Sequence, residues 1–242
     1  MTERELLYRA LYNAAFAGED PQFVDALFSR YYPQHVRVIE LDGKPVSMLF
    51  SIPYAVVLEK EVLDARYLYG VATDEHYRGQ GLARQLLLAE AAEHPVFLRP
   101  MSPSLFDYYG RVGFSPISPL CHEVGEASAP SGDERRLTKE EYLALRGGFA
   151  KTPLAVPTSD FLSLYENGGG FVACGDGALA LYEEKEDKIW FKEYWGSAEF
   201  APRLAAFLGK ERFSLRRVDA DGEAFGVGIG VPTDTAFLAA LD

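Results

Sequence analysis

The residues with the clearest chemical potential form a glycine-rich segment, Arg78-Gly79-Gln80-Gly81-Leu82-Ala83. The segment follows an apolar strand pattern that ends at Thr73, and it opens an amphipathic helical pattern that stops before Pro95. A glycine-rich turn that leads into a helix presents free backbone N–H groups at the positive end of the helix dipole, which favours a phosphate or pyrophosphate. The two glycines allow ligand oxygens to approach the backbone, and the arginine can add a charge-assisted hydrogen bond.

Two other kinds of phosphate loop do not fit this segment. The Walker loop needs a Lys-Ser/Thr pair where the helix begins, and Leu82-Ala83 stand there instead. The dinucleotide fingerprint needs three glycines in a wider spacing and an acidic residue about 20 positions later. The segment therefore indicates a pyrophosphate site of another type.

The elements around this segment alternate between helix and strand. Helices are expected over 3–17 and from the Asp20-Pro21 N-cap to Pro33, because apolar residues recur there at helical spacing. A hairpin is expected at Asp42-Gly43. The remaining expected elements of the first half are strands 36–41, 44–52, 54–58, 66–73 and 96–98, helices 81–93 and 104–111, and a last strand that ends near Glu123.

The second half repeats this order in outline. Residues 125–137 are rich in Gly, Ser, Pro and charge, which is typical of a linker, and we interpret 133–136 as a solvated charge run. Beyond it we expect helices 139–146, 160–167 and 198–208 and strands 171–174, 178–183, 189–194 and 213–218. Hairpin, strand, helix and strand thus occur around Asp176-Gly177 as they do around Asp42-Gly43, which favours an internal duplication; a chance match of common elements is the alternative.

Two motifs in this order resemble a known family. Arg78-x-x-Gly81-x-Ala83 is similar to the pyrophosphate motif of the GCN5-related N-acetyltransferases (GNAT), and Gly70-Val71-Ala72-Thr73 before it looks like the end of that family's fourth strand. Tyr109-Gly110-Arg111-Val112-Gly113-Phe114 resembles the family's Tyr-x-x-x-Gly-Phe segment. The resemblance covers about residues 35 to 124.

The resemblance implies an α/β (α+β) fold, in which helices flank a mixed, mostly antiparallel sheet. We expect a GNAT acetyl-CoA-binding catalytic domain over 1–124, a linker over 125–137 and a smaller, degenerate GNAT-like domain over 138–242. The second half has no Arg-x-x-Gly-x-Ala after Trp195-Gly196 and is not expected to bind CoA. Two-domain bacterial acetyltransferases with one degenerate copy, the enhanced-intracellular-survival aminoglycoside acetyltransferases among them, are similar in arrangement.

The resemblance also implies site residues. The pantetheine arm of acetyl-CoA would lie between the fourth strand and the next one, against Val71, Ala72 and Thr73, and Gly79, Gln80, Gly81, Leu82 and Ala83 would hold the pyrophosphate beside Arg78. An amine would attack the thioester directly. Tyr109 would then protonate the departing thiolate, since a phenol with a pKa of about 10 retains its proton at neutral pH; packing on the cofactor is its alternative role.

Two departures from the family are visible. The family's usual first strand has no counterpart before the first expected helix, and Ser102 stands where an Asn is common. The general base is not assigned. In the two-domain relatives the C-terminal end approaches the active site, which makes the Asp242 carboxylate a candidate.

Composition limits the other classes of function. A net charge of -12 repels nucleic acid, and no apolar run reaches the length of about 20 residues that a membrane helix needs. Cys121 and Cys174 are too few for a disulfide framework, and the four histidines have no metal-ligand spacing. We expect a cytoplasmic protein that holds no metal and binds neither nucleic acid nor membrane; its oligomeric state, a homo-oligomer included, stays open.

We therefore predict an acetyl-CoA-dependent N-acetyltransferase that acts on a primary amine of a small molecule or peptide. The acidic balance favours a cationic acceptor. The alternative is a non-catalytic acyl-CoA-binding regulatory module that keeps the glycine-rich segment without turnover.

Overall fold

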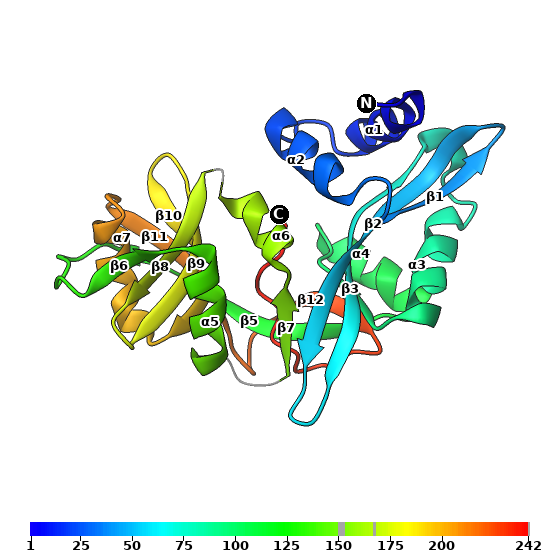
Figure 1. Ribbon diagram of the computed structural model, residues 1–242. Coiled ribbons are helices and arrows are strands. Elements are labelled where there is room, and N and C mark those ends of the chain that lie inside the picture. The colour runs from blue at the N-terminus through cyan, green and yellow to red at the C-terminus, as the bar shows by residue number, and fades with distance from the viewer. Residues whose placement is uncertain (150–152, 167, 242) are drawn as a thin grey trace. The chain divides into compact units, whose positions relative to one another are not determined.

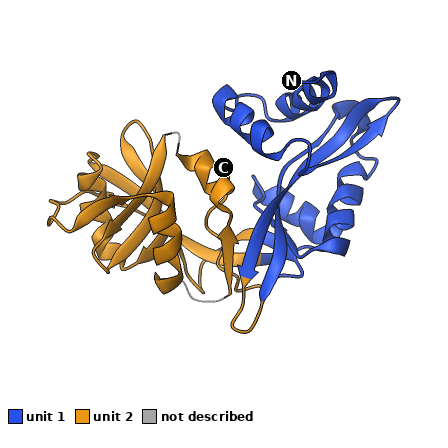
Figure 2. Cartoon of the chain, viewed as in Figure 1, with its two compact units in different colours: residues 1–56, 62–116, 227–231 blue, residues 57–61, 117–226, 232–242 orange. Residues whose placement is uncertain are grey.

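The chain forms two compact units in the computed structural model, which describes residues 1–149, 153–166 and 168–241. Unit 1 comprises residues 1–56, 62–116 and 227–231, and unit 2 comprises residues 57–61, 117–226 and 232–242 (Figure 2). This division differs from the predicted one, because unit 1 ends its main part at Pro116 rather than 124 and takes back a short segment from near the C-terminus.

Unit 1 holds the elements that carry the predicted site (Figure 1). They are α1 (Glu3–Ala15), α2 (Pro21–Tyr31), β1 (Val36–Leu41), β2 (Lys44–Val57), β3 (Val62–Thr73), η1 (Glu75–Tyr77), α3 (Leu82–Glu93), β4 (Val96–Leu98) and α4 (Pro103–Val112), with the end of β12 (Glu223–Ile229). The strand order is β1-β2-β3-β4-β12, where β1–β2 and β4–β12 are antiparallel and β3–β4 is parallel.

Local sequence signals account for several element ends in unit 1. The Asp20 side chain accepts a hydrogen bond from the Gln22 N–H and Pro21 opens α2, as the sequence predicts. Asp42 and Gly43 both have positive φ, which is the requirement of the tight hairpin turn between β1 and β2. The predicted break near Pro53 is wrong: β2 runs on to Val57, because the β1–β2 ladder ends at Phe50 and no β1 partner needs the missing N–H.

The sheet of unit 1 buries both of its faces. Leu49 and Leu68 pack with α3 and α4 residues in one apolar cluster. Phe50, the next residue of β2, points to the opposite face, where its ring meets Tyr12 of α1 at 5.9 Å and Phe28 of α2 at 5.2 Å between ring centroids. Helices α3 and α4 therefore cover one face of the sheet, and α1 and α2 cover the other.

Unit 2 has the strand order β5-β11-β10-β9-β8-β6, all antiparallel except the pair β10–β11. Its elements are β5 (Ser115–Glu126), β6 (Glu134–Leu137), α5 (Lys139–Phe149), β7 (Leu154–Pro157), α6 (Ser159–Leu162), η2 (Ser163–Tyr165), β8 (Gly169–Cys174), β9 (Ala178–Glu184), β10 (Lys188–Gly196), η3 (Ala198–Phe200), α7 (Ala201–Phe207) and β11 (Arg212–Val218). Residue 167, the end of one predicted helix, lies outside the described residues.

The predicted linker is partly ordered into strands. β5 continues to Glu126, and β6 overlaps the expected charge run and pairs with β8. Glu134 is buried, because its carboxylate accepts hydrogen bonds from the Ser131 and Gly132 N–H groups and from Arg203. The interpretation of 133–136 as a solvated run is therefore wrong for Glu134, whereas Asp133, Arg135 and Arg136 are exposed.

The structure keeps the predicted fold class, an α/β arrangement of helices and mostly antiparallel strands. Within the described ranges, no helix is both long and apolar enough to span a membrane.

Candidate functional site

The glycine-rich segment links η1 to the first turn of α3. Gly79 and Gly81 both have φ of +78°, a left-handed backbone that side chains other than glycine's rarely adopt. A Cβ at either position would meet nothing within 4 Å, so the space above the turn is open. Conformation and access to the backbone therefore both require glycine here.

The first turn of α3 leaves its N–H groups available. Gly81 is the N-cap and supplies no side-chain cap, and the first backbone bond of the helix runs from the Gln85 N–H to the Gly81 carbonyl at 3.0 Å. Within residues 1–149, 153–166 and 168–241, no acceptor is recorded for the N–H groups of residues 79–84. These donors point out of the positive end of a 12-residue helix, which is the arrangement that binds phosphate.

Arg78 and Thr73 frame the entrance to this turn. The Arg78 Nε donates to the Thr73 carbonyl oxygen at 3.2 Å, which leaves the rest of an exposed guanidinium beside the turn. The Thr73 hydroxyl lies 3.0 Å from the Ser47 Oγ, and Ser47 also donates to the Ala72 carbonyl at 3.1 Å. The end of β3 is therefore fixed against β2. Leu82 and Ala83 are partly buried and Gln80 is exposed.

Strands β3 and β4 part before β3 ends. Their parallel ladder comprises the pairs Arg66–Val96 and Tyr67–Phe97, whereas β3 continues to Thr73. The β4-facing edge of residues 68–73 is therefore without a strand partner along the described part of β4. This opening lies where the resemblance places the pantetheine arm, and Val71 and Thr73 border it.

A glycine changes the direction of side chains along β3. Leu68 and Val71 belong to the same cluster under α3 and α4, although residues three apart on a regular strand face opposite sides. Gly70 between them has φ of +62°, as in a bulge that inserts one extra residue. A Cβ at Gly70 would lie 2.7 Å from the Tyr12 ring, so this position is closed to larger residues.

Tyr109 lies on the inner side of α4, in the same apolar cluster as Val71 and the α3 residue Leu86. Its ring centroid is 5.1 Å from that of Tyr108 and 5.6 Å from that of Phe114, and only 6% of the residue is exposed. Burial, followed by the neighbouring Tyr108 phenol, raises the pKa of Tyr109 above its usual value. The hydroxyl makes no recorded hydrogen bond with the described residues, so its proton is available to a ligand.

The Tyr-x-x-x-Gly-Phe segment is a helix stop that holds Tyr109. Gly113 caps α4 with φ of +117°, and the N–H groups of Gly113 and Phe114 both donate to the Tyr109 carbonyl, at 3.1 and 3.0 Å. Phe114 is thereby turned back onto the Tyr109 ring. The Gly-Phe pair therefore fixes the backbone and the ring of the candidate acid.

We expect Gly113→Ala to lower the free energy of unfolding by about 1 kcal/mol, because alanine is strained in the left-handed region. Gly110→Ala in the same helix is the matched control; it should raise this free energy by up to about 1 kcal/mol, since Gly110 has helical backbone and an open Cβ direction. Urea unfolding of the two variants measures both effects. Equal changes of the same sign would contradict the role of the cap.

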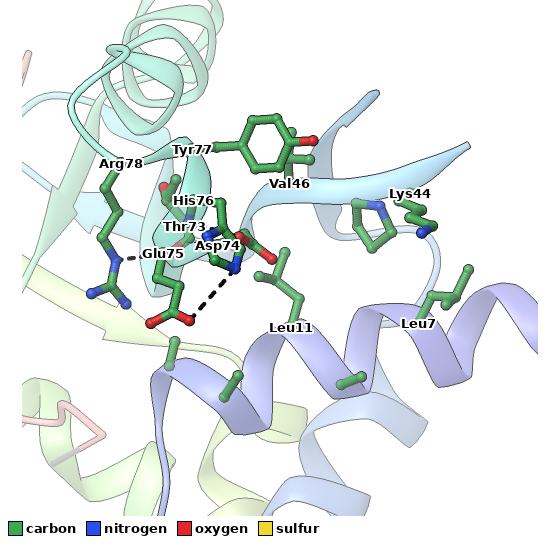
Figure 3. Close-up of a pocket in the computed structure, with 14 residues that line it drawn as sticks. Leu7, Leu11, Lys44, Val46, Thr73, Asp74, Glu75, His76, Tyr77 and Arg78 are labelled. Carbon is green, nitrogen blue, oxygen red and sulfur yellow. Dashed lines mark hydrogen bonds and ion pairs between the residues drawn. The ribbon is translucent and has the colours of Figure 1, made fainter. Parts of the chain in front are cut away.

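A cavity of about 420 Å³ adjoins the glycine-rich segment on the side of α1 (Figure 3). One wall is the face of α1 that presents Leu7 and Leu11, and another is the start of β2 at Lys44. Residues 73–78 supply the polar wall, so Thr73 and Arg78 border both the cavity and the turn. His76 in this wall is exposed, with its Nε2 3.7 Å from the Glu75 carboxylate, as expected for a solvated loop histidine.

Three residues that the sequence analysis did not single out form a polar cluster on the opposite face of the sheet from Tyr109. The Glu19 carboxylate, between α1 and α2, accepts hydrogen bonds from the Tyr12 and Tyr69 hydroxyls at 2.6 and 3.0 Å. In the sequence, the signal for this cluster was Tyr69, which stands directly before the strand end that resembles the family, two positions ahead of Val71.

Two other groups of polar residues do not add to this site. Asp133, Glu134 and Cys174 in unit 2 bring ligand-type atoms within 4.8 Å of one another, but the Arg203 guanidinium already binds both carboxylates. Asp242, the candidate base at the C-terminus, lies outside the described residues.

Comparisons with known proteins agree with this fold. Residues 3–117 match the family model of the acetyltransferase (GNAT) domain. Among curated proteins none matches the sequence. A probable N-acyltransferase from Enterococcus faecalis V583, a conserved protein of unknown function, has a similar structure, with a TM-score of 0.71 at 14% identity over 94% of this chain and 70% of that chain.

Two further solved structures are similar over nearly the whole chain. A GCN5-related N-acetyltransferase from Kribbella flavida gives a TM-score of 0.66 at 12% identity, over 94% of this chain and 70% of its own. Eis1 from Mycobacterium abscessus gives 0.64 at 11% identity, over 97% and 71%. At these identities the likeness shows the fold. Residues 3–117 of the chain belong to the GNAT acetyltransferase family.

Proposed function

We propose that this protein is an N-acetyltransferase that moves the acetyl group of acetyl-CoA to a primary amine by direct attack. The observation that carries the proposal is the open N-terminus of α3, where two left-handed glycines leave the donors of residues 79–84 without an acceptor in the described chain. A diphosphate satisfies such donors and also meets the Arg78 guanidinium.

The residues present also fit the pantetheine arm and the thioester of acetyl-CoA. The unpaired edge of β3 beside Val71, Ala72 and Thr73 offers main-chain groups to the amides of the pantetheine arm. The chain's own residues hold the thioester in place, and the acceptor nitrogen then forms a C–N bond to the acetyl carbon as the C–S bond breaks. Tyr109 gives its proton to the departing sulfur, and its raised pKa ensures that the phenol carries that proton at neutral pH.

Unit 2 supports the proposal that a single site operates. Its parallel pair β10–β11, joined through α7, matches the pair β3–β4 joined through α3, which supports a degenerate GNAT-like copy. The turn that leads from β10 towards α7 is closed to a ligand, however. A Cβ on Gly196 would lie 2.1 Å from the Gly177 carbonyl oxygen, and the Ser197 N–H already donates to that oxygen. We propose that unit 2 does not bind CoA.

The test supplies acetyl-CoA with a panel of polyamines, aminoglycosides and short peptides and follows the release of free CoA thiol. We expect release that depends on both the protein and an amine, together with an acetylated amine of matching amount by mass spectrometry. Calorimetric binding of CoA without thiol release on any amine would instead support the non-catalytic acyl-CoA-binding module.

A further inference from the structure

The cluster of Glu19, Tyr12 and Tyr69 has the geometry of a binding site for a cation. Each oxygen of the Glu19 carboxylate accepts one hydrogen bond from a phenol. The Tyr12 hydroxyl donates at 2.6 Å and the Tyr69 hydroxyl at 3.0 Å. A carboxylate has about four lone-pair directions, so about two acceptor positions stay open. Burial raises the pKa of both phenols and Glu19 raises them further, so the phenols remain donors and hold the carboxylate in one orientation.

The charge of Glu19 is not balanced by a neighbouring cation. Glu19 is partly buried, and among the residues that the structure describes, no Lys, Arg or His is recorded within 4.0 Å of its carboxylate. Arg9, on the same helix as Tyr12, binds Glu5 and Asp25. A partly buried carboxylate that only neutral hydroxyls contact attracts a positive ligand, because such a ligand restores the balance of charge.

Aromatic rings pack around Tyr69, one of the two phenols that donate to this carboxylate. The Tyr69 ring lies 6.5 Å from Phe16 in a stacked arrangement and 6.2 Å from Phe23 in an edge-on arrangement, measured between centroids. Phe16 and Phe23 flank Glu19 in the chain and both are partly exposed. Ring faces attract an ammonium group that is within about 6 Å, so rings and carboxylate favour the same kind of ligand.

The cluster also lies where the acceptor would be needed if the proposed function holds. A pyrophosphate held at residues 79–83 and a pantetheine arm held beside Thr73 and Val71 would bring the thioester near Gly70 and Tyr69. Two residues of a strand span about 7 Å. A reacting carbon in that place would be within reach of Tyr69 from the face of the sheet that α1 and α2 cover.

We infer that Glu19, with the rings of Phe16, Phe23 and Tyr69, is the recognition site for the protonated primary amine of the acceptor. This inference rests on the proposed function for its role in catalysis, but the binding of a primary ammonium by this cluster stands on the contacts of unit 1 alone. Glu19 selects cationic alkylamines over neutral alcohols of the same shape. It takes one proton from the bound ammonium, which frees the nitrogen lone pair for attack, and the second N–H proton passes to solvent as the amide bond forms.

The test is an NMR titration of the full chain, loaded with CoA so that no turnover occurs, with 1,5-diaminopentane. We expect saturable shifts of the Tyr69 ring resonances, no such shifts with the uncharged 1,5-pentanediol, and an affinity about 10- to 100-fold lower in Glu19→Gln, because a charge-assisted hydrogen bond is lost. Glutamine keeps an acceptor oxygen for the phenols, so the fold should be retained. Phe23→Leu should weaken binding about 3-fold.

Glu93→Gln is the matched control, since Glu93 is exposed on α3, which covers the other face of the sheet. It removes the same charge and should leave the affinity for the diamine unchanged. Equal affinity in the wild-type and Glu19→Gln proteins, or no binding to the wild type, overturns the inference. Calorimetry of CoA with CoA-free samples of the same proteins tests the proposed function separately, because a protein that binds the diamine but not CoA would retain this inference and lose the acyltransferase.

Discussion

The double variant Arg78→Ala, Gly81→Asp is expected to bind CoA at least about 100-fold more weakly than the wild-type protein. The arginine change removes a charge-assisted contact to the pyrophosphate, which is worth about 1.5–3 kcal/mol. The aspartate places a negative charge at the helix end that should hold an anion, and its Cβ is strained at φ of +78°. Isothermal calorimetry with CoA measures the loss.

The control for backbone strain is Gly209→Asp. Gly209 has φ of +80° and an open Cβ direction, like Gly81, but it follows α7 in unit 2. The control should lose a similar amount of stability and no CoA affinity. If the double variant bound CoA as the wild type does, the glycine-rich segment would not be the pyrophosphate site, and the enzyme proposal would lose its main support.

Tyr109→Phe is expected to lower kcat by about 100-fold or more, which is the usual contribution of a positioned general acid. The affinity for CoA and the free energy of unfolding should change little, because the ring stays in its cluster and its hydroxyl has no recorded partner in the described residues. Steady-state kinetics with the best amine of the panel, together with CoA calorimetry, measure these effects.

The control is Tyr108→Phe, which removes a neighbouring phenol that is less buried and whose pKa is also raised. It should keep most of the activity. Since burial raises the pKa of Tyr109 above 10, its acid form persists through neutral and mildly alkaline pH, and its loss should begin to lower kcat only above about pH 10. A Tyr109→Phe variant with wild-type kcat would leave Tyr109 with a packing role only.

The glycine-rich segment and the helix stop after Tyr109 could be predicted because their information is local. A left-handed glycine, a helix N-terminus and a Gly-Phe stop each involve residues within a few positions of one another. The boundaries of α3 agree with the prediction to within one residue, since Gly81 is the N-cap and Leu82 the first helical residue. The hairpin at Asp42-Gly43 follows the same rule.

Features that depend on distant partners were missed. The local sequence around Glu134 predicts a solvated charge, but the fold brings Arg203 to it from 69 positions away. Glu19 lies 50 positions from Tyr69, and nothing in the local sequence around Glu19 shows that two phenols meet its carboxylate. The strand β12 was not predicted, although its residues Val227–Ile229 pair with β4. Each of these features depends on a tertiary contact, which the periodicity of the sequence does not show.

The position of β12 near the end of the chain affects how unit 1 folds during synthesis. β4 is only three residues long, and its outer edge pairs with residues 227–229, which follow the main part of unit 1 by more than a hundred positions. A ribosome therefore releases the glycine-rich segment, Tyr109 and Glu19 long before it supplies the strand that closes this edge. An N-terminal fragment that stops at residue 124 would expose the backbone of β4 to other chains, and exposed strand edges promote aggregation. The sheet of unit 1 is therefore complete only when the chain has been synthesised through residue 229.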